Sequence, residues 1–108
     1  MTKTATPKLE ALLEEYKDIL VPLICKRIPQ CTIYLFGSRA RKDYREGADI
    51  DIAINAKNPL PLATLAALQC DLDETCIPVP VDFIDLQSVA EDFRARVLKE
   101  GIIWNKSA

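Results

Sequence analysis

The chain has 108 residues, of which 49 % are hydrophobic, and this composition is sufficient for a single folded domain over residues 1–108. A net charge of −2 argues against broad nucleic-acid binding, and no apolar run approaches the ~20 residues needed to span a membrane. The N-terminus lacks the apolar stretch of a secretory signal, so we expect a cytoplasmic protein with no membrane segment.

The four cysteines are expected to be free thiols, because a cytoplasmic chain sits in a reducing environment. Five residues intervene in each of the pairs Cys25/Cys31 and Cys70/Cys76, unlike the short spacing of zinc knuckles, and the chain contains no histidine. A structural role is therefore favoured over a metal or redox role.

The first predicted element is an amphipathic helix. Apolar residues recur at three- and four-residue steps from Pro7 to about Ile28, after a start signal at Thr6. Pro22 lies inside this pattern and removes one backbone hydrogen bond. The segment is therefore expected to be kinked, or split into two helices near Val21.

Two short strands are predicted to follow, with a turn and a loop between them. Residues 31–36 are β-branched or aromatic and end at Gly37, which is typical of a buried strand. Residues 38–42 suit one helical turn, and residues 43–48 read as a loop. Residues 49–55 alternate acidic or polar side chains with isoleucine, as a half-buried strand does.

The second half of the chain predicts a helix over 61–74, a strand over 81–86 and a last helix. Ser88 and Glu91 have the spacing of a capping box at the start of that last helix, which Gly101 ends after about residue 100.

The apolar tail at 102–104 is either a short strand added to the sheet or a patch that waits for a partner. The order helix, strand, strand, helix, strand, helix indicates an α/β (α+β) fold, with a small mixed sheet backed by helices on one side.

Two aspartates carry the clearest chemical signal. Asp49 and Asp51 are two residues apart on a predicted strand, so both side chains leave the same face. Their mutual repulsion is relieved if a divalent cation lies between them, and oxygen ligands favour Mg²⁺. Mg²⁺ usually completes its shell with phosphate oxygens, which indicates a nucleotide as the second component.

A phosphate-binding turn is predicted ahead of these aspartates. Gly37 and Ser38 follow a strand and offer backbone N–H groups and a hydroxyl to phosphate oxygens. Arg39 and Arg41 are close enough to neutralise a triphosphate, although the sequence leaves open which of them points inward. A plain turn and a solvated charged face are the ordinary alternatives. The arrangement of all parts in one strand-turn-strand unit favours the functional interpretation.

Gly37-Ser38, ten intervening residues and then Asp49-Ile50-Asp51 resemble the signature of the nucleotidyltransferase superfamily typified by DNA polymerase β. The run Leu-Phe-Gly-Ser-Arg-Ala-Arg at 35–41 is similar to that of the minimal nucleotidyltransferases. The resemblance implies a polymerase beta-like catalytic core over 30–104, preceded by an N-terminal helical segment at 1–29.

The resemblance also implies a third carboxylate on a later strand. Asp82 matches its position, and Asp85 is the competitor. Asp82 fits better, since Asp85 lies near the end of the strand and alternates to the opposite face.

The family then implies roles for these residues. Asp49 and Asp51 would hold one or two Mg²⁺ ions, and Asp82 would help a second ion to activate the acceptor hydroxyl. Gly37 and Ser38 would seat the β- and γ-phosphates of ATP. Attack on the α-phosphate would release pyrophosphate.

Similar minimal nucleotidyltransferases are paired with a helical HEPN partner as antitoxin and toxin. The leading hypothesis is therefore an antitoxin that attaches AMP to a tyrosine of such a partner. The first alternative is a nucleotide-binding subunit that silences its partner by masking a surface, and the second is a small-molecule (antibiotic-type) nucleotidyltransferase. The sequence leaves open the nucleotide, the acceptor hydroxyl, and whether the chain forms a homodimer or a heteromer.

Overall fold

Eight helices and strands follow one another along residues 6–105, the part of the chain that the structure, a computed structural model, describes. In chain order they are α1 (Pro7–Arg27), β1 (Cys31–Phe36), α2 (Ser38–Arg41), β2 (Ile50–Ala56), α3 (Leu62–Asp73), β3 (Val81–Asp85), α4 (Glu91–Glu100) and β4 (Ile102–Asn105). Within that range, no helix combines the length and the apolar character that crossing a membrane requires.

The four strands form one mixed sheet in the order β3-β2-β1-β4. β1 pairs antiparallel with both β2 and β4, whereas β2 and β3 run parallel. The apolar tail is therefore a strand of the sheet, with Ile103 opposite Tyr34. This decides between the two alternatives that the sequence left open.

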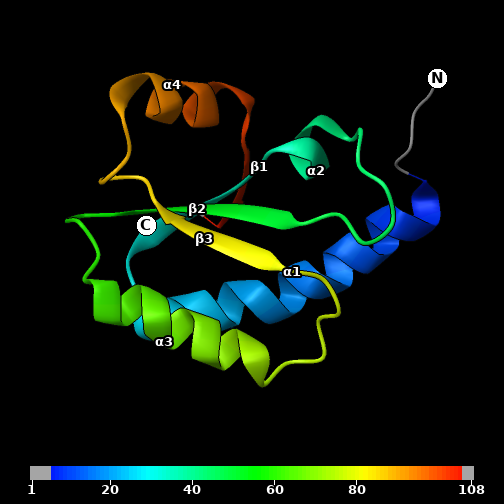
Figure 1. Cartoon of the computed structure of the whole chain (residues 1–108), viewed down its shortest axis with the longest axis horizontal. Helices are drawn as coiled ribbons and strands as arrows, with labels where there is room; N and C mark the ends of the chain where they lie inside the picture. Colours follow the sequence, from blue (N-terminus) through cyan, green and yellow to red (C-terminus); the bar gives the residue numbers. More distant parts are fainter. Residues whose placement is uncertain (1–5, 106–108) are drawn as a thin grey trace.

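Helices cover both faces of the sheet (Figure 1). α1 and α3 lie on one face, over a core that includes the fully buried Ile33, Ile52 and Ile54. α4 lies on the other face, where Ala53 and Val97 belong to a second, smaller core. The expectation that helices back only one side was wrong, because the second face of the strands also carries apolar residues.

α1 runs without interruption through Pro22, so the expected split near Val21 does not occur. Leu20 and Ile24, on either side of the proline, are fully buried against the sheet. Burial of two such side chains contributes roughly 1.5–3 kcal/mol each, which offsets the ~3 kcal/mol that a proline inside a helix costs. The start of the helix is as predicted, with the side chain of Thr6 accepting a hydrogen bond from the backbone N–H of Leu9 at 3.2 Å.

The capping box predicted for α4 is absent. Ala90 is the N-cap residue, and no side chain caps this helix. The Ser88 hydroxyl instead donates a hydrogen bond to Asp85 Oδ2 at 2.8 Å. The prediction was wrong because a buried carboxylate, three residues earlier in the chain, takes up the hydroxyl.

Candidate active site

Two neighbouring parallel strands bring two of the predicted carboxylates together. In the register of β2 with β3, Asp51 lies directly opposite Asp82. Paired residues in a parallel ladder project from the same face of the sheet, and here that face is opposite the isoleucine core. The start of the two strands is fixed by a hydrogen bond from Ile50 N–H to the Pro80 carbonyl at 2.9 Å.

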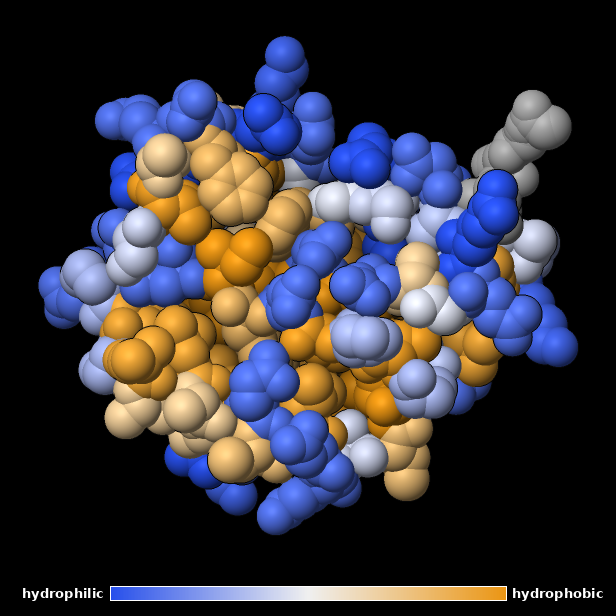
Figure 2. All heavy atoms as spheres, in the orientation of Figure 1, coloured by the Kyte–Doolittle hydropathy of each residue, from blue (hydrophilic) through white to orange (hydrophobic). Residues whose placement is uncertain are grey.

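Asp49 lies one residue before β2 begins, so it is an exposed loop residue and not a strand residue. Its charge still acts on Asp51, and so does that of Asp82. Figure 2 shows hydrophilic side chains where β2 and β3 begin, beside apolar ones between α4 and α3. The structure therefore gathers the three predicted aspartates at one end of the sheet.

The carboxyl group of Asp51 has a pKa above its ordinary value of 3.8. Burial is the largest cause, followed by the negative charges of Asp82 and Asp49, while Arg41 and Arg39 act in the opposite direction. The site thus carries negative charge that the protein does not fully balance. A divalent cation would supply the missing positive charge.

The donor set suits Mg²⁺, because it consists of carboxylate oxygens without sulfur or nitrogen. Among residues 6–105, no three acidic, cysteine or histidine side chains are gathered closely enough to enclose a metal ion by themselves. Mg²⁺ typically binds through one or two carboxylates together with substrate phosphates. The open arrangement therefore fits an ion that arrives with a nucleotide.

Gly37 lies directly against the carboxylate of Asp51. Its φ of +76° and ψ of −156° fall in a region that is essentially restricted to glycine. A Cβ atom at this position would overlap Asp51 Oδ2. Glycine is required here both by the backbone conformation and by the space that the carboxylate occupies.

Ser38 is the first residue of α2, the single helical turn that the sequence predicted. The turn is closed by hydrogen bonds from Ala40 and Arg41 N–H groups to the Gly37 carbonyl, both at 3.1 Å. These bonds fix the backbone of the turn, in which Gly37 lies against Asp51.

The two arginines of this turn have different surroundings. Arg39 is 3 % exposed, and its Nε and Nη2 donate to the Ala48 carbonyl at 3.2 and 2.6 Å. Arg41 lies at the surface in an ion pair with Asp43 at 3.3 Å. The structure therefore places Arg39 inside the loop and leaves Arg41 as the exposed cation of the turn.

Asp85, the competitor for the third carboxylate, is on the opposite face from Asp82 and is 5 % exposed. Its oxygens accept hydrogen bonds from Leu60 N–H at 2.7 Å, Gln87 N–H at 3.0 Å and the Ser88 hydroxyl. These contacts make Asp85 a structural residue that ties the flanking loops to the end of β3.

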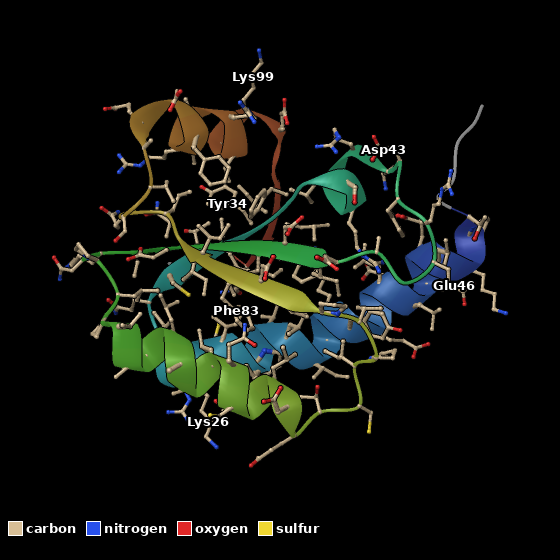
Figure 3. The ribbon with its side chains drawn as sticks, in the orientation of Figure 1. Lys26, Tyr34, Asp43, Glu46, Phe83 and Lys99 are labelled. Carbon is tan, nitrogen blue, oxygen red and sulfur yellow. The ribbon has the colours of Figure 1, made fainter. Side chains whose placement is uncertain are left out.

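Figure 3 shows the alternation of faces. Phe83, next to Asp82 in the chain, points toward the α1 and α3 side, whereas Tyr34 of β1 lies toward α4.

The four cysteines, Cys25, Cys31, Cys70 and Cys76, are all free thiols, as expected.

Sequence reasoning missed Tyr44 and Glu10. Tyr44 is 1 % exposed, and its hydroxyl donates to Glu10 of α1, 34 residues earlier. A tyrosine inside a charged, turn-rich loop is the only sequence signal for this contact. No local pattern links it to the first turn of α1.

Comparisons with known proteins identify the family of the chain. The family model described as "Polymerase beta, Nucleotidyltransferase" matches residues 8–107, and the chain therefore belongs to this family of nucleotidyltransferase enzymes. A relative in Haemophilus influenzae, named "Probable protein adenylyltransferase MntA", is 28 % identical over 100 residues, which cover 93 % of this chain and 87 % of the relative.

Two solved structures extend the comparison. A toxin-antitoxin structure with AMP-PNP superposes with a TM-score of 0.73 at 27 % identity, covering 84 % of this chain and 73 % of that chain. A structure of the tri-AMPylated Shewanella oneidensis HEPN toxin in complex with an MNT antitoxin gives a TM-score of 0.64 at 26 % identity, covering 87 % and 72 % of the two chains. Both confirm the polymerase beta-like fold.

Proposed function

We propose that the chain is a protein adenylyltransferase antitoxin that transfers AMP from ATP to a tyrosine hydroxyl of a HEPN-type partner. The observation that carries this proposal is the pairing of Asp51 with Asp82 beside Gly37 on the open face of the sheet. The relatives named as adenylyltransferases, and the complexes of similar antitoxins with HEPN toxins, support the choice of nucleotide and partner.

Each residue of the site has a distinct part in the proposed reaction. Asp49, Asp51 and Asp82 would hold Mg²⁺, which when bound offsets the charge of the phosphates and promotes ionisation of the acceptor hydroxyl. Gly37 leaves room for the Asp51 carboxylate beside the turn. The backbone N–H groups of the turn and the Ser38 hydroxyl would donate to the phosphate oxygens.

The arginines would act at two distances. Arg41 is the exposed cation that balances the triphosphate, and its charge reaches Asp51. Arg39 supports the site from within the loop. The acceptor oxygen attacks the α-phosphorus in line with the departing pyrophosphate, so positioning and charge neutralisation account for most of the catalysis.

The acceptor must come from another molecule, because the described residues form the sheet and its covering helices without a second lobe over the site. A HEPN partner that brings its tyrosine to the open face would complete the site.

The test is to recover the tagged protein with its partner, add Mg²⁺ and α-labelled ATP, and follow the label on protein. We expect label on the partner, and we expect its loss both with a chelator and in the variant Asp49→Asn with Asp51→Asn. The matched control changes the exposed Asp18 of α1 and Asp73 of α3 to Asn in the same way, and should retain transfer.

Two outcomes would overturn the proposal. A partner that is silenced equally well by the Asp49/Asp51 variant, without label, would establish masking in place of catalysis. Label on small molecules alone would point to a small-molecule nucleotidyltransferase.

A further inference from the structure

Three side chains from two distant segments form a connected series behind the loop that leads into β2. The Tyr44 hydroxyl donates to Oε2 of Glu10 in α1, and the Arg39 guanidinium lies 4.5 Å from the centroid of the Tyr44 ring. Arg39 in turn donates two hydrogen bonds to the Ala48 carbonyl. We refer to this series, Glu10–Tyr44–Arg39–Ala48, as the loop clamp.

The burial of Arg39 indicates a role in hydrogen bonding in addition to packing. A guanidinium removed from water is costly unless its hydrogen-bonding groups are satisfied, and an apolar side chain of similar volume is often the more stable choice. Arg39 is nevertheless 3 % exposed, and it is held by one backbone carbonyl and one aromatic ring. An apolar residue could not donate the two hydrogen bonds that hold the Ala48 carbonyl.

These hydrogen bonds act on the residue directly before Asp49. The Ala48 carbonyl and the Asp49 nitrogen belong to one planar peptide unit, so fixing the carbonyl also fixes the backbone position of Asp49. On the other side, Ile50 N–H is bonded to the Pro80 carbonyl at 2.9 Å. Asp49 is therefore held between two anchors, although it lies outside the strand and is exposed.

We propose that the loop clamp positions Asp49 for binding of Mg²⁺·ATP, with Glu10 and Tyr44 as positioning residues that act through Arg39. The inference rests on the proposed function, since it concerns how the same site binds its nucleotide. It assigns to the first turn of α1 a part in nucleotide binding that the carboxylate motif alone does not contain.

Glu10 is well placed to complete the clamp. Its second oxygen, Oε1, accepts from Lys42 Nζ at 2.9 Å, so both carboxylate oxygens are bound by residues at the start of the loop. The clamp therefore joins α1 to both ends of the segment between α2 and β2.

The test is Tyr44→Phe, which removes the hydroxyl but keeps the ring under Arg39. We expect the Mg²⁺ concentration for half-maximal ATP binding, measured by calorimetry, to rise about tenfold, the lower end of the ~10–100-fold that loss of a group orienting a metal ligand typically costs in metal affinity. Saturating Mg²⁺ should restore binding. Tyr16→Phe, the same change at a partly buried tyrosine of α1, is the matched control and should leave the Mg²⁺ dependence unchanged.

A second measurement follows the loop itself. Amide hydrogen exchange of residues 45–49 in the nucleotide-free chain should accelerate in Tyr44→Phe, while the amides of β1 and the centre of β2 keep wild-type rates. A lower melting temperature with unchanged Mg²⁺ dependence would show that Tyr44 only stabilises the fold. Faster loop exchange without a change in Mg²⁺ dependence would equally overturn the proposal.

Coupling of the residues provides the last part of the test. Glu10→Ala removes the contacts to both Tyr44 and Lys42, so its Mg²⁺ shift should be at least that of Tyr44→Phe. Adding Tyr44→Phe to Glu10→Ala should add nothing further, whereas additive shifts would contradict a single series of contacts. Glu10→Gln keeps an oxygen that accepts from Tyr44 and should stay close to wild type.

The proposed function can fail separately. Normal Mg²⁺·ATP binding with the expected shifts but no label on a partner would reject AMP transfer and retain the clamp. Absence of any Mg²⁺·ATP binding by the wild-type chain would reject both.

Discussion

The two faces of the sheet come from the same strands but differ in what they contribute. On the face toward α1 and α3, Ile50, Ile52 and Ile54 of β2 are fully buried. On the opposite face of the same strand, Asp51 is half-buried beside Asp82, and α4 packs farther along, over Ala53. Apolar and acidic side chains thus alternate residue by residue over the start of β2.

This difference shows how a chain of this size separates stability from chemistry. The period of two along a strand allows one face to supply burial while the other collects like charges. The pKa of Asp51 is raised by burial and then by the charges of Asp82 and Asp49, so ionised Asp51 opposes folding as long as no cation balances it. The closed face must therefore supply the stability that the open face lowers.

The sharpest way to test the comparison uses two aspartates on opposite faces of β3. Asp82→Asn should lower AMP transfer by at least ~100-fold, which is the scale of removing one preorganised electrostatic group, with little change in melting temperature. Asp85→Asn should leave transfer intact in the folded protein but lower stability by about 1–3 kcal/mol, because an amide cannot accept all of the hydrogen bonds that Leu60, Gln87 and Ser88 donate to the carboxylate. Labelled-ATP assays and denaturant titrations measure the two effects. The reverse pattern would mean that Asp85 is the catalytic carboxylate.

Truncation on the closed face is expected to affect stability alone. Ile52→Ala removes a side chain with no exposed surface, next to Asp51, and should lower the free energy of unfolding by roughly 2–5 kcal/mol. Calorimetric binding of Mg²⁺·ATP, measured below the unfolding transition, should match wild type. Weaker nucleotide binding at such temperatures would show that the two faces are not independent.

The glycines provide a smaller contrast. Gly37→Ala should weaken both Mg²⁺·ATP binding and stability, because its Cβ would overlap the Asp51 carboxylate. Gly47→Ala also imposes a positive φ, of 84°, but its Cβ would meet open space, so we expect only the ~1–2 kcal/mol backbone cost. Equal binding constants for the two variants would argue against Gly37 as part of the site.

The smallest expected effect is a pH-dependent change in melting temperature, which has opposite sign for substitution of Asp51 and of Asp71. The pKa of Asp51 is raised above 3.8, chiefly by burial, so its ionisation lowers stability at neutral pH. The pKa of Asp71 is lowered below 3.8 by its hydrogen bond to Arg27, so the ionised Asp71 side chain stabilises the fold at pH values above 3.8. At pH 7, Asp51→Asn should therefore melt higher than wild type and Asp71→Asn slightly lower.

Both differences should shrink as the pH falls. The Asp51 difference disappears as wild-type Asp51 takes up its proton on passing through its raised pKa, and the Asp71 difference disappears as the pH passes below 3.8 through the lowered pKa. Melting temperatures from pH 7 to 3 measure this. A wild-type melting temperature above that of Asp51→Asn at pH 7 would contradict this electrostatic explanation.

The sequence determined what depends on local spacing. The alternation along β2 placed Asp51 on the face opposite the isoleucines, because side chains on a strand change sides at every residue. The same pattern was wrong for Asp49, because β2 begins only at Ile50. Gly37 before a short helical turn was likewise apparent from a β-rich run that stops at a glycine, and the strand bounds at 31–36 agree with β1.

Tertiary structure alone decided the contacts between distant segments. The parallel register of β2 with β3 sets Asp82 opposite Asp51, and the burial of Arg39 depends on Tyr44 and on a carboxylate from α1. It also turned Ser88 from a predicted helix cap into a partner of Asp85. Sequence periodicity specifies which face a side chain occupies, but the partner it meets there is specified only when the sheet register and the loops are closed.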